Sequence, residues 1–400
     1  MSGLTGSGGR PMMPAMVRIR RVEALPSRFR NESVYLGSHD VPDGSRDYFT
    51  RPQLRAVYSR YFETTFVKIT TDDGATGWGE CLAPVVPQVV ATIVNDLLAE
   101  NVVGMDALAH AAIRSRLYNL MRDRGYFGGF YVDAITAIDM ALWDVRGRAL
   151  GTSIASLLGG PYRDDVPAYV SAIGGVEDSE KERLVGEWRE RGFRGFKHHG
   201  GYGKERDLHT MRAICRAAGS ESIVGYDGHW NFTPYEAETM GRHLEEIGVS
   251  FFEAPCDPED VNAHARIAGN LAIPIAIGES IRTRYEYLPW LEQRAADILQ
   301  PDIGRSGISE AVALASMAEP FSVTIAPHLS VGLGPMVAAS IHVAASIPNL
   351  YMLEYQPPTM SLANKLLENP IELVDGCYQI PDGDGLGIAI SERRIRDLQA

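Results

Sequence analysis

Cysteine is scarce, and no paired-cysteine motif is present. The 400 residues include only Cys81, Cys215, Cys256 and Cys377. None lies close enough to another to give the short spacing typical of zinc or redox sites. Disulfide frameworks are typical of much shorter secreted chains. We therefore expect reduced thiols in a cytoplasmic protein.

Long apolar runs and basic clusters are also missing. No uninterrupted apolar stretch reaches the roughly 20 residues that cross a bilayer, which excludes an integral membrane protein. The chain has 38 Lys and Arg against 51 Asp and Glu, a formal net charge of −13 at pH 7. Without a basic run, nucleic acid and anionic membranes are poor partners. A small anionic substrate fits only if a local cation offsets this charge.

The remaining composition is that of a globular chain, with 45% apolar and 22% charged residues. Residues 1–16 are rich in Gly, Ser, Pro and Met without an apolar core, so we expect a disordered tail and not a signal peptide. The length suits two or three domains, or a β/α barrel of about 250 residues with a smaller companion.

Residues 17–150 predict an α+β domain. Val17–Leu25 has a strand pattern, and Phe62–Thr71 with Gly77–Cys81 forms a predicted hairpin around an Asp-Gly turn. From about residue 86 the apolar spacing becomes helical. Between the strands, residues 26–52 show no periodicity, and a loop of this length inside a compact domain is often a functional lid.

From about residue 166 one pattern repeats: a short apolar run, polar residues at its end, then an amphipathic helix. Continuous apolar strands alternating with helices predict a buried parallel sheet, and eight such units predict an α/β fold of the (β/α)₈ barrel type over residues 151–354. An open doubly wound sheet is the competitor, but residues 172–176 (AIGGV) do not supply the GxGxxG pattern of its phosphate-binding turn. Residues 355–400 are expected to return to the first domain. The eight runs are Pro167–Ala172, Gly195–Lys197, Ser222–Tyr226, Val249–Phe252, Pro274–Ile277, Ala296–Gln300, Ser322–Ala326 and Leu350–Leu353.

Three neighbouring runs end in carboxylates: Asp227, Glu253 and Glu279, each 26 residues after the previous one. The carboxyl ends of barrel strands meet on one face, so three like charges converge there and repel one another unless they are protonated or bridged by a cation. Ligation by oxygen with open positions suits Mg²⁺. We therefore predict a magnesium site.

Proton-transfer groups follow other runs. Asp302 follows the sixth run and His328 the seventh, so the carboxylate is expected beside the imidazole, which would make His328 a general acid or base. At the second run, strand alternation sends Lys197 and His199 to one face and His198 to the other. We predict Lys197 and His199 as the second catalytic pair.

At this point the sequence resembles the enolase superfamily, and within it the mandelate racemase branch. The resemblance covers nearly the whole chain after the tail and includes residues 141–145 (ALWDV), 252–255 (FEAP), 277–280 (IGES), 300–302 (QPD) and 353–354 (LE). It implies a capping domain before the barrel, with the early loop closing over the substrate. It also implies a Lys or His base working with Mg²⁺, the ligands and dyad given above, and Glu354 as a hydrogen-bond partner of the enediolate.

Two features bear on the reaction. The branch commonly has Lys-x-Lys on the second strand, whereas this chain has His199 at the base position. Residues 227–229 (DGH) resemble the Asp-x-His motif of some sugar-acid dehydratases, in which the His helps to expel a hydroxyl, so His229 is a further candidate. The expected chemistry is removal of the proton α to a carboxylate, followed by dehydration of a sugar acid to a 2-keto-3-deoxy acid. We also expect a homo-oligomer.

Several alternatives stay open. The same intermediate serves racemisation, epimerisation and the cycloisomerisation of a lactone. A metal-dependent hydrolase usually has a His-x-His motif on the first strand, and residues 169–173 contain no His. If the chain were a non-catalytic binding protein, part of the set of metal ligands and proton-transfer residues should be missing. All of these residues are present in the sequence.

Overall fold

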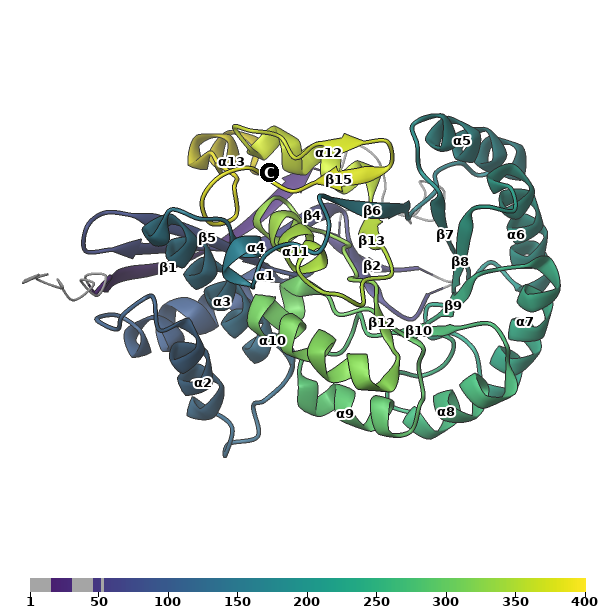
Figure 1. Ribbon diagram of the computed structural model, residues 1–400, viewed down its shortest axis with the longest axis horizontal. Helices are drawn as coiled ribbons and strands as arrows, with labels where there is room; N and C mark the ends of the chain where they lie inside the picture. The colour runs from purple at the N-terminus through teal and green to yellow at the C-terminus, as the bar shows by residue number, and fades with distance from the viewer. Residues whose placement is uncertain (1–15, 31–45, 52–53) are drawn as a thin grey trace, which may run out of the picture.

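The computed structural model describes residues 16–30, 46–51 and 54–400. It contains a front domain built on a small antiparallel sheet and a barrel of parallel strands surrounded by helices, which confirms the predicted fold class (Figure 1). Within the described ranges, no helix is both long enough and apolar enough to cross a membrane. The expected tail falls almost entirely on residues 1–15, outside the described part.

The front domain consists of a three-stranded sheet with helices packed against it. The sheet has the order β1-β4-β5. β1 and β4 pair from Ile19↔Thr71 to Arg30↔Tyr61, and β4 and β5 form the predicted hairpin. A separate apolar core joins this sheet to its helices. The elements are β1 (Ile19–Arg30), β4 (Tyr61–Thr71), β5 (Thr76–Cys81), α1 (Pro87–Thr92), η2 (Ile93–Leu98), η3 (Ala99–Asn101), α2 (His110–Leu120) and α3 (Gly129–Leu150).

The predicted loop over residues 26–52 is partly wrong. β1 continues to Arg30, because the ladder with β4 extends five residues beyond the predicted strand end. Near the end of the predicted loop, Tyr48–Thr50 forms a short strand, β2, which pairs with β3 (Val57–Ser59). The central part of the predicted loop, residues 31–45, lies outside the described residues.

The barrel contains all eight predicted strands in sequential order. Neighbouring strands from β6 to β12 are parallel partners, and β13 pairs with β6. An isolated parallel bridge between Ile325 and Leu350 closes the ring. The strands are β6 (Asp165–Val170), β7 (Gly195–His199), β8 (Ile223–Asp227), β9 (Phe251–Glu253), β10 (Ile275–Ile277), β11 (Ile298–Leu299), β12 (Thr324–Ile325) and β13 (Leu353–Tyr355).

Helices cover the outside of the barrel, and the end of the chain lies against both parts. β15 pairs antiparallel with β6, while the amide of Ala400 donates to the carbonyl of Arg28 in β1. Figure 1 shows this segment in yellow above the barrel and the front domain. The elements are α4 (Ile154–Leu157), α5 (Asp178–Glu190), α6 (Lys204–Ala218), α7 (Pro234–Ile247), α8 (Val261–Asn270), α9 (Arg284–Glu292), α10 (Ile303–Ala318), η4 (Glu319–Phe321), α11 (Pro335–Ala345), α12 (Pro357–Leu366), β14 (Leu373–Val374), β15 (Cys377–Gln379) and α13 (Glu392–Leu398).

Two glycines of β5 allow α3 to approach the sheet closely. A Cβ atom on Gly79 would lie 2.0 Å from the backbone oxygen of Ala137, and one on Gly77 would lie 2.6 Å from that of Ala141. Both contacts are with backbone, which cannot rotate away. The distance between α3 and the sheet therefore depends on the absence of these two side chains.

We expect Gly79→Ala to lower the free energy of unfolding by about 1–3 kcal/mol, because the added methyl group overpacks the interface between α3 and β5. Chemical denaturation monitored by circular dichroism measures this change. Gly186→Ala, in α5, is the matched control: nothing lies within 4 Å of its new Cβ, so a stabilisation of about 0.5–1 kcal/mol is expected. Equal effects of the two substitutions would contradict the close-packing argument.

Candidate active site

The polar residues that follow the strands lie together at the carboxyl end of the barrel. His199, Asp227 and Glu253 occupy matching positions in the parallel ladders of β7, β8 and β9. Glu279 follows β10, and Glu354 lies in β13. Register therefore brings side chains from strands far apart in sequence to the same height.

Lys197 stands at the centre of this negative charge. Its Nζ is 2.8 Å from Oε1 of Glu253 and 3.1 Å from Oε1 of Glu354, and all three side chains are almost fully buried. Burial alone would lower the pKa of Lys197, but the two carboxylates raise it well above its usual value. Lys197 is therefore a fixed positive charge. His198 lies on the opposite face as predicted, with its ring near Tyr226.

The carboxylates are crowded: Asp227 and Glu253 are buried, whereas a quarter of the Glu279 side chain is exposed. Burial raises the pKa of Asp227 and of Glu253 to about 7, against the opposing effect of Lys197. The other oxygen of Glu253 accepts a hydrogen bond from Nε2 of Gln300 at 2.5 Å. Glu279 accepts from the indole nitrogen of Trp230 at 2.9 Å. A cluster of this kind gains stability from any added cation.

Asp302 and His328 form the predicted dyad. Nδ1 of His328 lies 2.6 Å from Oδ2 of Asp302, and its Nε2 lies 3.1 Å from Oε2 of Glu279. Burial alone would lower the pKa of His328, but Glu354, Asp302 and Glu279 raise it well above its usual value. The second oxygen of Asp302 caps α10 by accepting from the amide of Gly304 at 2.7 Å. One carboxylate thus fixes both a helix start and an imidazole.

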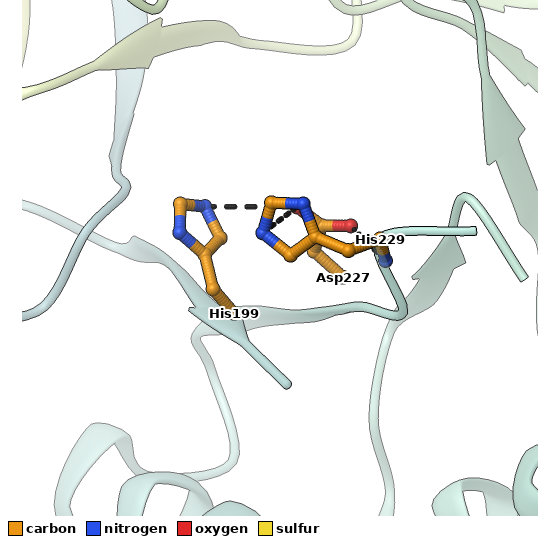
Figure 2. A group of neighbouring side chains, drawn as sticks. All are labelled: His199, Asp227 and His229. Atoms are coloured by element: carbon orange, nitrogen blue, oxygen red, sulfur yellow. Dashed lines mark hydrogen bonds and ion pairs between the residues drawn. The ribbon is translucent and has the colours of Figure 1, made fainter. Parts of the chain in front are cut away.

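His199 and His229 lie on the other side of the carboxylates. Nε2 of each ring faces Oδ2 of Asp227, at 3.7 Å from His199 and 3.4 Å from His229 (Figure 2). The ring of His199 also contacts the hydroxyl of Ser171 at 3.0 Å. Burial lowers the pKa of both imidazoles. The Asp-x-His motif therefore brings His229 next to the predicted base.

The donor chemistry fits the predicted magnesium ion. Asp227, Glu253 and Glu279 present carboxylate oxygens from adjacent strands, and the burial and mutual repulsion of Asp227 and Glu253 favour a bound cation. Glu253 and Glu279 are engaged by protein donors here. Among the described residues, the three ligand atoms that all lie within 4.8 Å of one another belong to His199, Asp227 and His229. The assignment of the carboxylate ligands stays a prediction.

A cavity of about 800 Å³ lies between the carboxyl end of the barrel and the front domain. Its barrel side includes His229, Glu279 and His328, and its other side comes from the front domain. Tyr58 and the almost fully buried Arg51 belong to that second side, with the guanidinium 5.5 Å from the Tyr58 ring centroid. The front domain therefore covers the side of the cavity that faces away from the barrel.

The sequence analysis missed several residues of this site. Ser171 and Gln300 lie within the last two positions of predicted runs, so their position offered a signal. Trp230 binds Glu279 through a left-handed turn at His229 and Trp230, which the sequence pattern does not indicate. Arg51 and Tyr58 enter the cavity through domain packing alone.

Comparison with known proteins shows the family of this chain. Residues 180–394 match the family model described as enolase C-terminal domain-like, and residues 51–159 match the mandelate racemase/muconate lactonizing enzyme N-terminal domain. The chain belongs to the mandelate racemase/muconate lactonizing enzyme family. Its front domain is thus the capping domain of this family, and members of the enolase superfamily use a divalent metal.

Relatives within the family carry more than one activity. The chain is 35% identical over 348 residues to a D-galactarolactone cycloisomerase of Agrobacterium fabrum, a match covering 83% of this chain and 90% of the relative. It is 30% identical over 355 residues to an arabinonate dehydratase of Saccharolobus solfataricus, with 88% and 94% covered. A crystal structure of an enolase superfamily member from Agrobacterium tumefaciens has a TM-score of 0.91, with 33% identity and 96% and 99% covered. The chain is an enzyme of this superfamily.

We expect Asp302→Asn to lower the pKa of His328 in the metal-free protein, because the substitution removes a negative partner at 2.6 Å. Asn still caps a helix well, so the fold should be retained. An NMR titration of the histidine resonances measures the change. Asp297→Asn is the control: this carboxylate accepts from the amide of Ile275 at the start of β10. A similar shift in both variants would contradict a direct effect.

Proposed function

We propose that the chain catalyses the magnesium-dependent dehydration of a sugar acid to a 2-keto-3-deoxy acid. The observation that carries the proposal is the presence of imidazoles on both sides of the carboxylate cluster: His328 with Asp302 on one side, and His199 with His229 on the other. Removal of an α proton and departure of a β-hydroxyl need one base and one acid. The named activity of the arabinonate dehydratase supports the same reaction class.

Asp227, Glu253 and Glu279 would hold Mg²⁺. The bound ion would supply positive charge to the substrate carboxylate and so make the neighbouring proton more acidic. Lys197 adds a second positive charge beside Glu253 and Glu354. Because Lys197 is buried and positioned before the substrate arrives, it stabilises negative charge that develops on the substrate without reorganisation.

Proton transfer is assigned to the chain's own imidazoles. His199 and His328 approach the substrate from β7 and from the end of β12, which are separated in the ring by β6 and β13. One removes the α proton, and the other protonates the β-hydroxyl, so that the carbon–oxygen bond breaks and water leaves. Asp302 holds the ring of His328 through Nδ1, so its Nε2 is the transferring atom on that side. His229 lines the cavity, which supports it as an alternative acid for the departing hydroxyl.

Cycloisomerisation of a sugar-acid lactone is the second candidate. The specific observation in its favour is the 35% identity to the D-galactarolactone cycloisomerase over most of both chains. The two reactions share the first proton transfer. They differ in the leaving group, which is a free hydroxyl in dehydration and the lactone carboxylate oxygen in cycloisomerisation.

The substrate class is tested with a library of aldonic and aldaric acids and their lactones in the presence of Mg²⁺. We expect formation of a 2-keto acid from at least one open-chain acid, measured by semicarbazide derivatisation, and loss of this activity after treatment with EDTA. Protein incubated without the chelator is the matched control. Conversion of a lactone with no turnover of any open-chain acid would instead establish the second candidate.

On a substrate found in this way, we expect His199→Asn and His328→Asn each to lower turnover by about 10²–10⁴-fold, the usual contribution of a positioned acid or base. Incorporation of deuterium at the α carbon in D₂O, measured by NMR, then identifies the base as the residue whose loss stops exchange. His243→Asn, on the outer helix α7, is the control. Unchanged exchange in both active-site variants would overturn the two-base assignment.

A further inference from the structure

We infer that His199, Asp227 and His229 form a second cation site, which takes a nitrogen-preferring transition ion such as Zn²⁺ or Co²⁺. The site is distinct in its ligands from the all-oxygen magnesium site, although Asp227 belongs to both. A bound ion would occupy both imidazoles, which are proton-transfer groups in the proposed function. The site is therefore inhibitory.

The geometry is that of a partly assembled metal site. Each of the three side chains offers one ligand atom, and these atoms all lie within 4.8 Å of one another. Oδ2 of Asp227 is 3.4 Å from Nε2 of His229 and 3.7 Å from Nε2 of His199 (Figure 2). Bonds of about 2.0–2.1 Å to a tetrahedral ion place ligand atoms about 3.3 Å apart. The two separations between imidazole and carboxylate are therefore within about 0.4 Å of those in a tetrahedral site.

A buried imidazole nitrogen without a hydrogen bond supports a missing partner at this site. Nε2 of His229 is buried and makes no hydrogen bond among the described residues, although its ring lies beside a carboxylate. A buried polar atom of this kind is rare in native proteins and calls for an unseen ion or water. On the other ring, Nε2 of His199 makes a hydrogen bond with the Ser171 hydroxyl and also faces Oδ2 of Asp227.

The backbone holds the three side chains in place. His199 and Asp227 are paired residues at the ends of two parallel strands. His229 has a left-handed φ of 49°, and its amide donates to Oδ1 of Asp227 at 2.8 Å. This turn directs the His229 ring back over Asp227, so that its Nε2 faces Oδ2 while the amide binds Oδ1. The ligand positions are thus set by strand register and one tight turn, with no need for a long loop to close.

The donor set decides which ion binds. Two imidazoles and one carboxylate suit Zn²⁺, Co²⁺ and Ni²⁺, whereas Mg²⁺ prefers oxygen ligands and keeps its water. Affinity of nitrogen-containing sites rises along the first transition series. An excess of Mg²⁺ therefore fills the carboxylate site and leaves the two imidazoles available. His229 lines the cavity, which gives the ion a route from solvent.

The test is a titration of the protein with Co²⁺ in the presence of excess Mg²⁺, followed by visible absorption. We expect one equivalent of Co²⁺ to give the intense d–d bands of a low-coordinate, nitrogen-ligated ion, and added Zn²⁺ to remove them. In His229→Asn and in His199→Asn we expect affinity to fall by at least about 100-fold, because the loss of even a supporting group costs about 10–100-fold.

His243→Asn is the matched control, since this histidine lies on α7 and pairs with Glu246. It should bind Co²⁺ as the wild type does. Absence of the bands in folded wild-type protein would overturn the inference, as would binding that neither active-site substitution weakens. The readout needs no substrate, so its result is independent of whether dehydration is the correct reaction.

Discussion

Buried negative charge at one end of the barrel is the constraint on which the rest of the site depends. Five of the eight strands deliver a carboxylate to this end, and one buried lysine lies among them. Isolated charges of this kind are costly to remove from water, and the cost is offset only by counter-charges and hydrogen bonds. The surrounding donors, among them Gln300, Trp230 and the amide of Leu329, are arranged for this purpose.

The capping domain takes part in this arrangement as well as closing the cavity. Glu80 of β5 accepts hydrogen bonds from the amide of Leu333, just before α11, and from the amide of Met336, in the first turn of α11. The segment between β12 and α11 carries His328 and is therefore held at both ends, by Asp302 on the imidazole and by Glu80 on the backbone. Binding and chemistry thus rest on contacts that run between the two domains.

The barrel and most of its polar residues were predictable because strand period and strand ends are local properties. A carboxylate that ends a run, such as Asp227 or Glu253, reaches the face that parallel register dictates. The extension of β1 to Arg30 was not predictable, because pairing with β4 overrides a sequence without alternation. The places of Arg51 and Tyr58 depend on how one domain sits on the other, which no local pattern encodes.

The double role of Asp302 has an evolutionary consequence. Its two oxygens join the imidazole of His328 to the first turn of α10, and α10 is itself tied to α3 of the capping domain through the hydroxyl of Thr136 and the carbonyl of Arg305. The capping domain and the imidazole of His328 are therefore structurally coupled, so a change in one is expected to affect the other. Recombination that gave this barrel a foreign front half would also misalign the imidazole, so new substrates are more easily reached by point changes around the cavity than by exchange of whole modules.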